Sequence, residues 1–353
     1  MVKIRVLVVD DSAYSRQTIR EILETDPGIE VVGVSSEGTD AMTKTLKLKP
    51  DLITLDLEMP GMNGFAFLRW LMKKKPTPVI IVSSYSDTKT VFKALEIGAA
   101  DFTSKPSKIA SIGIQDMKKD LLEKVKGIKN LRLDKLSKNL EFFEEDTHQK
   151  FLEKPEHGIE AVVIGASTGG PAALSILIAR LPSYFPAGIA ISQHMPKGFT
   201  ASFAERLNTI SKLYVKEAVD GEEMERGKVL VCPGGFHMRF KKRGQRVVVL
   251  IKEPKSTDKY IPSVDLMMSS AAEVFGPKTL GVILTGMGND GMAGMLEIKN
   301  RGGYTIAESE ATAVVFGMPS EAIKTGAIGR VLSISEIPVE IIRLVREAEL
   351  VED

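Results

Sequence analysis

The first half of the chain alternates short apolar runs with longer stretches in which apolar residues recur every three or four positions. Short runs rich in β-branched residues predict buried strands, and the periodic stretches predict amphipathic helices. The predicted strands are 4–9, 31–34, 52–55, 79–82 and 101–103, and the predicted helices are 14–24, 39–47, 64–73, 89–96 and a segment after Lys105. Five successive strand–helix units predict a doubly wound, five-stranded parallel sheet.

A second alternation of the same kind runs from about residue 158 to the end of the chain. The predicted strands are 161–164, 188–192, 228–231, 247–251, 280–284 and 304–307, with a hairpin around 234–245. This pattern predicts a second doubly wound, mostly parallel α/β domain. The two halves share no visible repeat motif, so the pattern does not indicate a duplication.

Between the two halves the composition changes. Lysine and arginine residues dominate from about residue 121, and acidic residues follow them before residue 155. Charge runs of this kind are typical of a solvated helical extension and linker. We therefore expect one domain over 1–124, a charged linker over 125–157 and a second domain over 158–353.

The overall composition indicates an ordinary soluble protein. The 353 residues are 43% hydrophobic and 26% charged with a net charge of +1, so no nucleic-acid surface is expected. The apolar runs are too short to cross a bilayer, and the N-terminus enters a strand without a signal-peptide pattern. We expect a cytoplasmic monomer without membrane insertion. The single cysteine, Cys232, lies in an apolar run and is expected to be a buried core thiol rather than a nucleophile.

Polar residues stand at the ends of several predicted strands in the first half. Asp10 and Asp11 follow the first strand, Asp56 the third, Ser83 the fourth and Lys105 the fifth. Parallel strands present their carboxyl ends at one edge, where three carboxylates repel one another unless a cation joins them. A cluster without His or Cys suits Mg²⁺ rather than Zn²⁺. Alternatively, Asp10 and Asp11 only cap the first helix, which leaves Asp56 and Lys105 unexplained.

A serine stands in the corresponding place in the second half. The apolar run 159–164 leads into Gly165-Ala166-Ser167-Thr168-Gly169-Gly170-Pro171, and a helix-like stretch follows. The glycines allow a close approach of the backbone to a substrate, and the N–H groups of the new helix can bind a developing anion. The pattern therefore predicts a serine nucleophile at the carboxyl end of a strand, and acyl-transfer chemistry.

A serine nucleophile needs a base, and the chain has four histidines. His148 lies in the charged linker and His157 just before the first strand of the second half, so both are poor candidates. His194 follows a predicted strand at the same sheet edge as Ser167 and is the favoured base. His237, after a Pro-Gly-Gly turn, is the reserve base or a residue that lines the substrate groove.

The glycine-rich turn 285–291 supplies the remaining candidates. Asp290 lies just beyond a buried strand and is the candidate that orients the base, a role compatible with capping the helix that starts at Met292. The backbone N–H of Met287 is a candidate oxyanion-hole donor. Loss of such a donor costs roughly 10²–10³ in rate.

The first 124 residues resemble a response-regulator receiver domain. The resemblance covers Val8-Val9-Asp10-Asp11-Ser12, the segment 55–64 around Asp56, Ser83, Phe102 and Lys105-Pro106. It implies a flavodoxin-like fold in which Asp56 is the phosphoacceptor and Asp10, Asp11 and Asp56 bind Mg²⁺. It also implies that Ser83 and Phe102 form the switch pair that senses the phosphoryl group, and that Lys105 contacts a phosphoryl oxygen.

The whole chain resembles the chemotaxis protein-glutamate methylesterases of the CheB family, through residues 165–171, Gln193-His194-Met195 and 285–291. The outer glycines around Ser167 also fit the G-x-S-x-G spacing of α/β-hydrolases, but those enzymes have the chain order Ser–Asp–His. The resemblance implies a Ser167–His194–Asp290 triad without a cofactor.

The same resemblance implies a function. The chain would hydrolyse glutamate methyl esters on methyl-accepting chemoreceptors and deamidate selected receptor glutamines. A chemotaxis histidine kinase would be the phosphodonor, and the unphosphorylated receiver would pack against the catalytic cleft.

Two other functions remain as alternatives. The glycine-rich loop after a strand also suits a dinucleotide-binding oxidoreductase, although the only Tyr-x-x-x-Lys spacing, Tyr85 to Lys89, lies in the first half. A response regulator with a DNA-binding output is the second alternative. It would require a basic recognition helix, which the second half lacks.

Overall fold

The computed structural model describes residues 3–84, 88–105, 111–127 and 158–345. The chain divides into two compact units, residues 1–137 and 138–353, which we treat separately. The last helix of the first unit continues to Gly127, past the expected domain end at residue 124. The rest of the expected linker, with His148 and His157, lies outside the described residues. The exact domain boundaries therefore stay a prediction.

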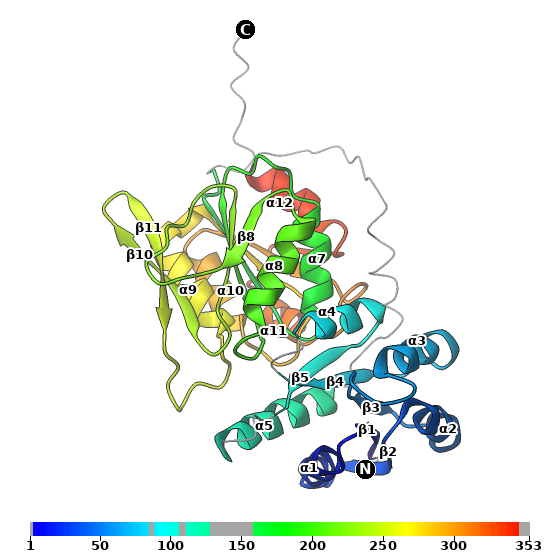
Figure 1. Ribbon diagram of the computed structural model, residues 1–353. Coiled ribbons are helices and arrows are strands. Elements are labelled where there is room, and N and C mark those ends of the chain that lie inside the picture. The colour runs from blue at the N-terminus through cyan, green and yellow to red at the C-terminus, as the bar shows by residue number, and fades with distance from the viewer. Residues whose placement is uncertain (1–2, 85–87, 106–110, 128–157, 346–353) are drawn as a thin grey trace. The chain divides into compact units, whose positions relative to one another are not determined.

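The first unit contains a five-stranded parallel sheet with strand order β2-β1-β3-β4-β5 (Figure 1). Its strands are β1 (Ile4–Val9), β2 (Ile29–Ser35), β3 (Leu52–Leu55), β4 (Val79–Ser83) and β5 (Asp101–Ser104). The central strands are buried on both faces, which explains their almost continuous apolar sequences. The predicted doubly wound sheet is confirmed.

Helices cover both faces of this sheet. They are α1 (Ala13–Glu24), α2 (Gly38–Leu48), α3 (Gly64–Lys74), α4 (Thr88–Ile97) and α5 (Ser111–Gly127). The helices α1 and α5 pack together over the side chains of Val6, Val8, Ile80 and Val82, while α3 packs between α2 and α4. Because the five strands are parallel, their carboxyl ends lie at one edge of the sheet.

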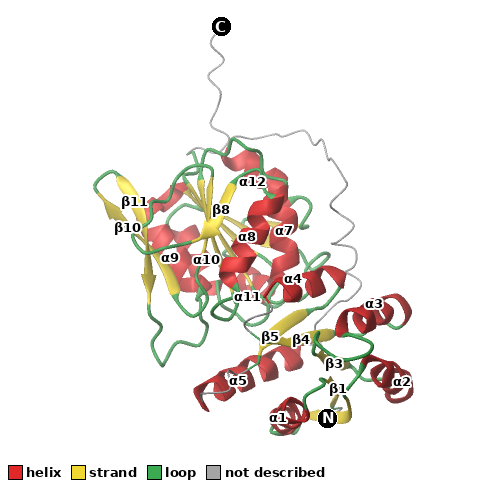
Figure 2. Cartoon of the chain, viewed as in Figure 1, coloured by secondary structure: helices red, strands yellow, loops and turns green. Residues whose placement is uncertain are grey.

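The second unit contains a seven-stranded parallel sheet with order β14-β13-β12-β6-β7-β9-β8. Figure 2 shows its strands in yellow between the red helices. Its strands are β6 (Ala161–Ala166), β7 (Gly188–Gln193), β8 (Tyr214–Glu217), β9 (Lys228–Val231), β12 (Thr279–Ile283), β13 (Tyr304–Glu308) and β14 (Arg330–Leu332). The second predicted parallel sheet is thus confirmed. The two strands that the pattern missed, β8 and β14, are short and partly exposed edge strands, so they lack an apolar run.

Helices again occupy both faces, with α9, α10 and α11 packed together on one side and α8 and α12 packed against α7 on the other. Their bounds are α7 (Gly170–Ala179), α8 (Thr200–Ile210), α9 (Val264–Phe275), α10 (Met292–Asn300), α11 (Met318–Lys324) and α12 (Ile337–Val345), with a 3₁₀ turn η4 (Gly276–Lys278). The predicted hairpin forms as β10 (His237–Arg243) and β11 (Arg246–Lys252) and packs on α9.

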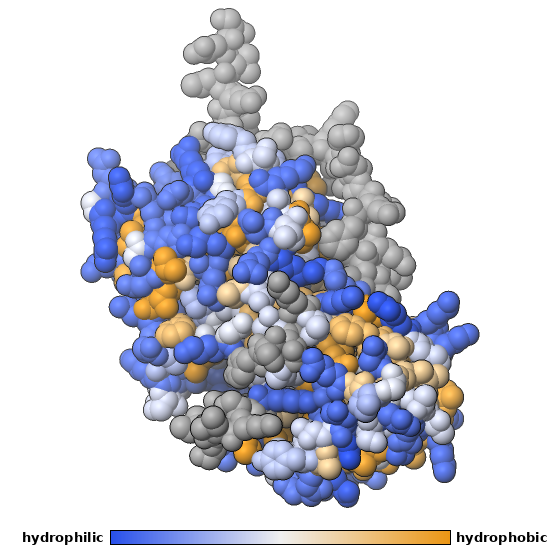
Figure 3. Space-filling view, viewed as in Figure 1, coloured by the Kyte–Doolittle hydropathy of each residue, from blue (hydrophilic) through white to orange (hydrophobic). Residues whose placement is uncertain are grey.

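Hydrophilic side chains predominate over the face seen in Figure 3, including the region of the β10–β11 hairpin. Among the described residues, no helix combines the length and apolar character needed to span a bilayer.

Candidate active site and receiver site

Three carboxylates meet at the carboxyl edge of the first sheet. One oxygen each of Asp10, Asp11 and Asp56 lies within 4.8 Å of the others. The ammonium of Lys105 lies 2.9 Å from Asp10 and 2.5 Å from Asp56. The alternative that the aspartates only cap α1 is not supported, because Ser12 is the N-cap residue and Asp10 accepts the Ser12 N–H.

The electrostatics of this cluster suit a divalent cation. Burial raises the pKa of Asp10; the Lys105 cation opposes this effect and the neighbouring Asp56 adds to it. The buried Oδ2 of Asp10 lies 2.9 Å from the Lys105 ammonium, which is its ion-pair partner. Burial lowers the pKa of Lys105, but hydrogen bonds to Asp10 and Asp56 raise it more. One cation facing three carboxylates leaves negative charge that a hard metal ion would neutralise.

The expected switch residues lie in the neighbouring strands β4 and β5. Ser83 ends β4 and Phe102 lies in the middle of β5, and both side chains are buried. The backbone N–H of Lys105 donates to the carbonyl of Ser83 at 2.7 Å, so the two strand ends are joined. The Phe102 ring packs edge-on against Phe92, with the ring centroids 6.3 Å apart. Pro106 lies outside the described residues.

In the second unit, Ser167 immediately follows β6, in the turn that leads into α7. Its backbone N–H donates to the Thr285 carbonyl at 3.0 Å, and its carbonyl accepts from the Gln193 amide at 2.9 Å. Gly169, the N-cap of α7, has a φ of +80°, which favours glycine. The half-buried Ser167 side chain makes no hydrogen bond within the described part of the chain, so its hydroxyl is available for chemistry.

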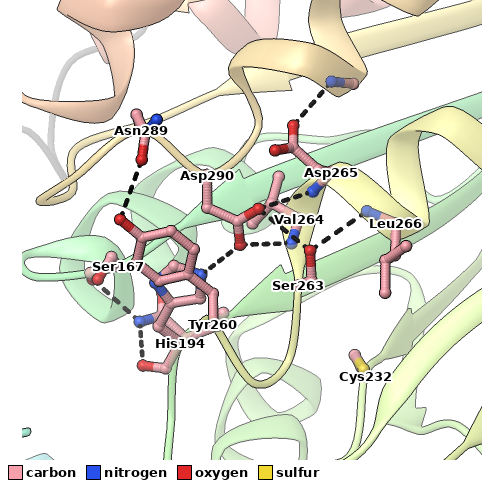
Figure 4. Close-up of polar contacts among 12 residues, drawn as sticks. Ser167, His194, Cys232, Tyr260, Ser263, Val264, Asp265, Leu266, Asn289 and Asp290 are labelled. Carbon is pink, nitrogen blue, oxygen red and sulfur yellow. Dashed lines mark hydrogen bonds and ion pairs between the residues drawn. The ribbon is translucent and has the colours of Figure 1, made fainter. Parts of the chain in front are cut away.

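His194 follows the neighbouring strand β7 and is tied to the same turn. Its backbone N–H donates to the Ala166 carbonyl at 3.0 Å, and the Gln193 amide donates to the carbonyls of both Ser167 and His194. The His194 Nε2 lies 2.7 Å from Oδ2 of Asp290 (Figure 4). The structure therefore brings the predicted serine, histidine and aspartate to one sheet edge.

Asp290 is held by the N-terminus of α9. Its carboxylate accepts hydrogen bonds from the N–H groups of Val264 (2.7 Å) and Asp265 (2.9 Å) and from the Ser263 hydroxyl (3.2 Å), as Figure 4 shows. The prediction that Asp290 caps the helix starting at Met292 is wrong, because Gly291 is that N-cap and makes no side-chain cap. The carboxylate instead serves a helix distant in sequence, where backbone N–H groups favour an anion.

These donors decide the ionisation of Asp290. Burial raises its pKa, but the hydrogen bond and positive charge of His194, with the N–H groups of Asp265 and Val264, bring it below its usual value. The ionised carboxylate can only accept, so Nε2 of His194 carries a proton, and Nδ1 holds the lone pair when the imidazole is neutral. The second carboxyl at this helix end, that of Asp265, accepts the N–H of Gly294 at 2.7 Å.

Thr285 supports the turn that carries Ser167 through its hydrogen bonds. Its hydroxyl donates to the Thr168 carbonyl and accepts the Val315 N–H, both at 2.9 Å. Its N–H donates to the buried carboxylate of Glu308 at 2.8 Å. Burial raises the pKa of Glu308 to about 7, against smaller opposing effects of the hydrogen bonds from Thr285 and Thr312.

Met287 directly follows Gly286, which packs closely against Ser167. A Cβ atom built on Gly286 would be 2.8 Å from the Ser167 Cβ and 2.4 Å from the Met318 Sδ, so only glycine fits there. The Met287 N–H makes no hydrogen bond to any residue that the structure describes. No acceptor in the described part of the chain therefore occupies this N–H.

Tyr260 is the main site residue that the sequence pattern did not reveal. Its ring stacks on His194 with centroids 5.1 Å apart and planes 7° from parallel, and its hydroxyl donates to Asn289 at 3.1 Å. Tyr260 lies in a loop without strand or helix, so no periodicity pointed to it. The Ser263-Val264-Asp265 sequence does carry a recognisable helix-start signal, a Ser cap followed by an acidic residue.

Cys232 and His237 are both buried and take no direct part in this arrangement. Cys232 is fully buried and burial raises the pKa of its thiol, so the expected inert core cysteine is confirmed. His237 is also buried, with Nε2 at 2.9 Å from Asp258 and Nδ1 accepting the Ser263 N–H at 3.1 Å. Both ring nitrogens of His237 are thus occupied, which leaves neither free to act as the base.

Comparison with known proteins agrees with this arrangement. Residues 6–113 match the response regulator receiver domain family and residues 162–341 match the CheB methylesterase family. The protein-glutamate methylesterase/protein-glutamine glutaminase 3 of Geobacter sulfurreducens is 47% identical, covering 97% of this chain and 98% of its own length. The corresponding protein of Pyrococcus abyssi is 43% identical, covering 97% of this chain and 94% of its own.

A solved structure also matches the second unit. The crystal structure of the Thermotoga maritima CheB methylesterase catalytic domain is 45% identical in sequence and matches with a TM-score of 0.51. The match covers 53% of this chain and 98% of that domain. Together with the near full-length relatives, it shows that the chain belongs to the CheB methylesterase family, with a response-regulator receiver domain preceding the methylesterase domain.

Proposed function

We propose that this protein is a phosphorylation-regulated serine esterase that hydrolyses glutamate methyl esters on methyl-accepting chemoreceptors. The observation that carries the proposal is that Ser167 and the hydrogen-bonded His194–Asp290 pair lie at the ends of neighbouring strands. The relatives' name as methylesterases supplies the substrate class. The alternatives of an NAD-dependent oxidoreductase and a DNA-binding output have no support in the family match.

In the acylation step, Ser167 Oγ forms a bond to the ester carbonyl carbon while its proton passes to the lone pair on His194 Nδ1. The carbonyl electrons move to oxygen, and the free N–H of Met287 is the proposed donor to that oxyanion. Collapse of the intermediate breaks the bond to methoxide, which takes the proton from His194 and leaves as methanol. Asp290 stabilises the imidazolium that forms between these proton transfers.

Deacylation repeats the sequence with water. His194 takes a proton from water as the water oxygen attacks the acyl carbon, and Ser167 Oγ leaves with that proton. The product is a free glutamate side chain. The same steps deamidate a receptor glutamine, since ammonia then replaces methanol as the leaving group, in accord with the relatives' second name.

The receiver supplies the regulation. We propose Asp56 as the phosphoacceptor, with Asp10, Asp11 and Asp56 holding Mg²⁺. A Mg²⁺ bound there would neutralise the charge of the phosphoryl oxygens. Lys105 already contacts Asp56 and would contact a phosphoryl oxygen in its place, while Ser83 and Phe102 would respond to it.

We further propose that a chemotaxis histidine kinase is the phosphodonor and that the unphosphorylated receiver restrains the esterase. A shift from 1:99 to 99:1 in favour of the active form requires roughly 5.5 kcal/mol of differential stabilisation. A cytoplasmic location, a monomeric state and the absence of nucleic-acid binding stand as further proposals. Cell fractionation, size-exclusion chromatography and a DNA-binding titration test them.

The deciding experiment is methanol release from methylated chemoreceptor membranes, with acetyl phosphate and Mg²⁺. We expect release by the parent protein and none by Ser167→Ala. Asp56→Asn is expected to keep the basal rate and lose its stimulation by acetyl phosphate. Equal release by the parent and Ser167→Ala would exclude Ser167 as the nucleophile, and equal rates with and without the phosphodonor would exclude the regulation.

A further inference from the structure

The buried His237 bridges the two ends of a short loop. Its Nε2 lies 2.9 Å from Oδ2 of Asp258, and its Nδ1 accepts the backbone N–H of Ser263 at 3.1 Å. A backbone N–H can only donate, so Nδ1 holds a lone pair and the ring proton is on Nε2, donated to Asp258. The imidazole therefore joins residues 258 and 263 with one hydrogen bond at each end.

The loop between these two contacts carries Tyr260, whose ring stacks on His194. Asp258 is fixed in turn by the Lys255 N–H, which donates to the same Oδ2 atom at 2.7 Å. No strand or helix holds residues 258–262, so the bridge across the base of the loop sets where Tyr260 lies. A displaced loop would take the ring away from one face of His194.

The other end of the bridge reaches the carboxylate that orients His194. Ser263 is the N-cap of α9, and its hydroxyl accepts the Leu266 N–H and donates to Asp290. The next two N–H groups, of Val264 and Asp265, complete the set of donors to that carboxylate (Figure 4). Fixing the Ser263 N–H therefore fixes the first turn of α9, in which Asp290 is bound.

We propose that His237 is a positioning residue for the esterase: it clamps the loop 258–263 and so holds both Tyr260 and the Asp290 cradle against His194. The proposal rests on the esterase function proposed above. It gives the reserve histidine a role that needs no contact with substrate, and it explains why a histidine with two occupied nitrogens is buried beside the site.

The test compares four variants of the full-length protein. His237→Leu removes both contacts at similar volume, and Asp258→Ala removes one. Asp258→Asn is the matched control, because both donors reach the single oxygen Oδ2, which the amide oxygen can replace. Ser167→Ala tests the proposed function itself. The assays are kcat and KM for methanol release from methylated receptor membranes, and hydrogen–deuterium exchange of residues 258–266.

We expect His237→Leu and Asp258→Ala to lower kcat about 10- to 100-fold with KM within about twofold, because small misplacements of reacting groups carry that cost. Exchange should quicken in residues 258–266 and not elsewhere in the second unit, and Asp258→Asn should stay within about threefold of the parent kcat. Unchanged kcat in His237→Leu, equal damage by Asp258→Asn and Asp258→Ala, or quickened exchange throughout the unit would overturn the clamp. Parental activity in Ser167→Ala would refute the proposed function instead, and the exchange data alone would then decide the clamp.

Discussion

The buried Glu308 should make the stability of the second unit depend on pH in an unusual direction. Its carboxylate is fully buried, accepts from the Thr285 N–H and the Thr312 hydroxyl, and has no ion pair within the described part of the chain. Burial raises its pKa from 4.5 to about 7. The folded state therefore holds a proton that the unfolded chain releases at lower pH.

The sign and size follow from proton linkage. A raised pKa gives stability that is complete below about pH 4.5 and is lost as the pH rises through about 7. A pKa shift of this size contributes about 3 kcal/mol to the free energy of unfolding at low pH. About 2.5 kcal/mol of this contribution is lost between pH 5 and pH 8. In Glu308→Gln the amide oxygen can still accept the Thr285 N–H without an ionisable group. The free energy of unfolding of the variant, relative to that of the parent, should therefore rise by about 2.5 kcal/mol from pH 5 to pH 8.

The assay must separate the two units. The single tryptophan, Trp70, lies in α3 of the first unit, so its fluorescence reports only the receiver. Hydrogen exchange of β12 and β13 in increasing urea follows the second unit at each pH. Glu205, which is exposed in α8 of the same unit, offers a control, and Glu205→Gln should leave the pH dependence unchanged. A parent–variant difference that stays flat from pH 5 to pH 8, or an equal effect of the two substitutions, would refute the reasoning.

Four further substitutions, at three positions, test the esterase site. Asp290→Asn should lower kcat roughly 10³–10⁴-fold, because an amide NH₂ directed at Nε2 forces the wrong His194 tautomer; kcat near the parent value would contradict this orienting role. Gly286→Ala should abolish methanol release, since the new methyl group would meet Ser167 at 2.8 Å; a folded, active variant would show that the turn has room to move. Tyr260→Phe, which keeps the ring stacked on His194, should retain kcat within about threefold, whereas Tyr260→Ala should lose more in the same assay; equal kcat in both variants would show that the stacking has no catalytic weight.

Much of the fold, and the site residues at the strand ends, could be predicted because parallel α/β sheets follow local rules. Buried central strands read as apolar runs, and polar residues just after such runs collect at one sheet edge. That reasoning placed Asp56 beside Asp10, and Ser167 beside His194, without knowledge of any contact. It missed β8 and β14 because edge strands are partly exposed and need no apolar run.

The supporting residues could not be predicted because their roles depend on contacts between distant segments. Asp290 lies next to the start of α10 in sequence, yet it binds the start of α9. His237 and Ser263 are separated by 26 positions and meet through one hydrogen bond, from the Ser263 backbone N–H to the His237 imidazole. No periodicity encodes such a pairing, since each partner satisfies its local pattern equally well without the other.

Both sites lie at the carboxyl edge of a parallel sheet, but the pKa of the buried aspartate is shifted in opposite directions in the two. Asp10 shares its edge with two more carboxylates and one lysine, so burial and like charge keep its pKa raised and leave negative charge to be neutralised. Asp290 stands among hydrogen-bond donors from α9 and His194, so its pKa falls below its usual value. The receiver cluster therefore holds more carboxylates than cations, whereas the esterase carboxylate is surrounded by hydrogen-bond donors. This difference predicts that chelating divalent metal should remove the stimulation by acetyl phosphate and leave basal methanol release unchanged; loss of the basal rate on chelation would contradict a metal-free esterase site.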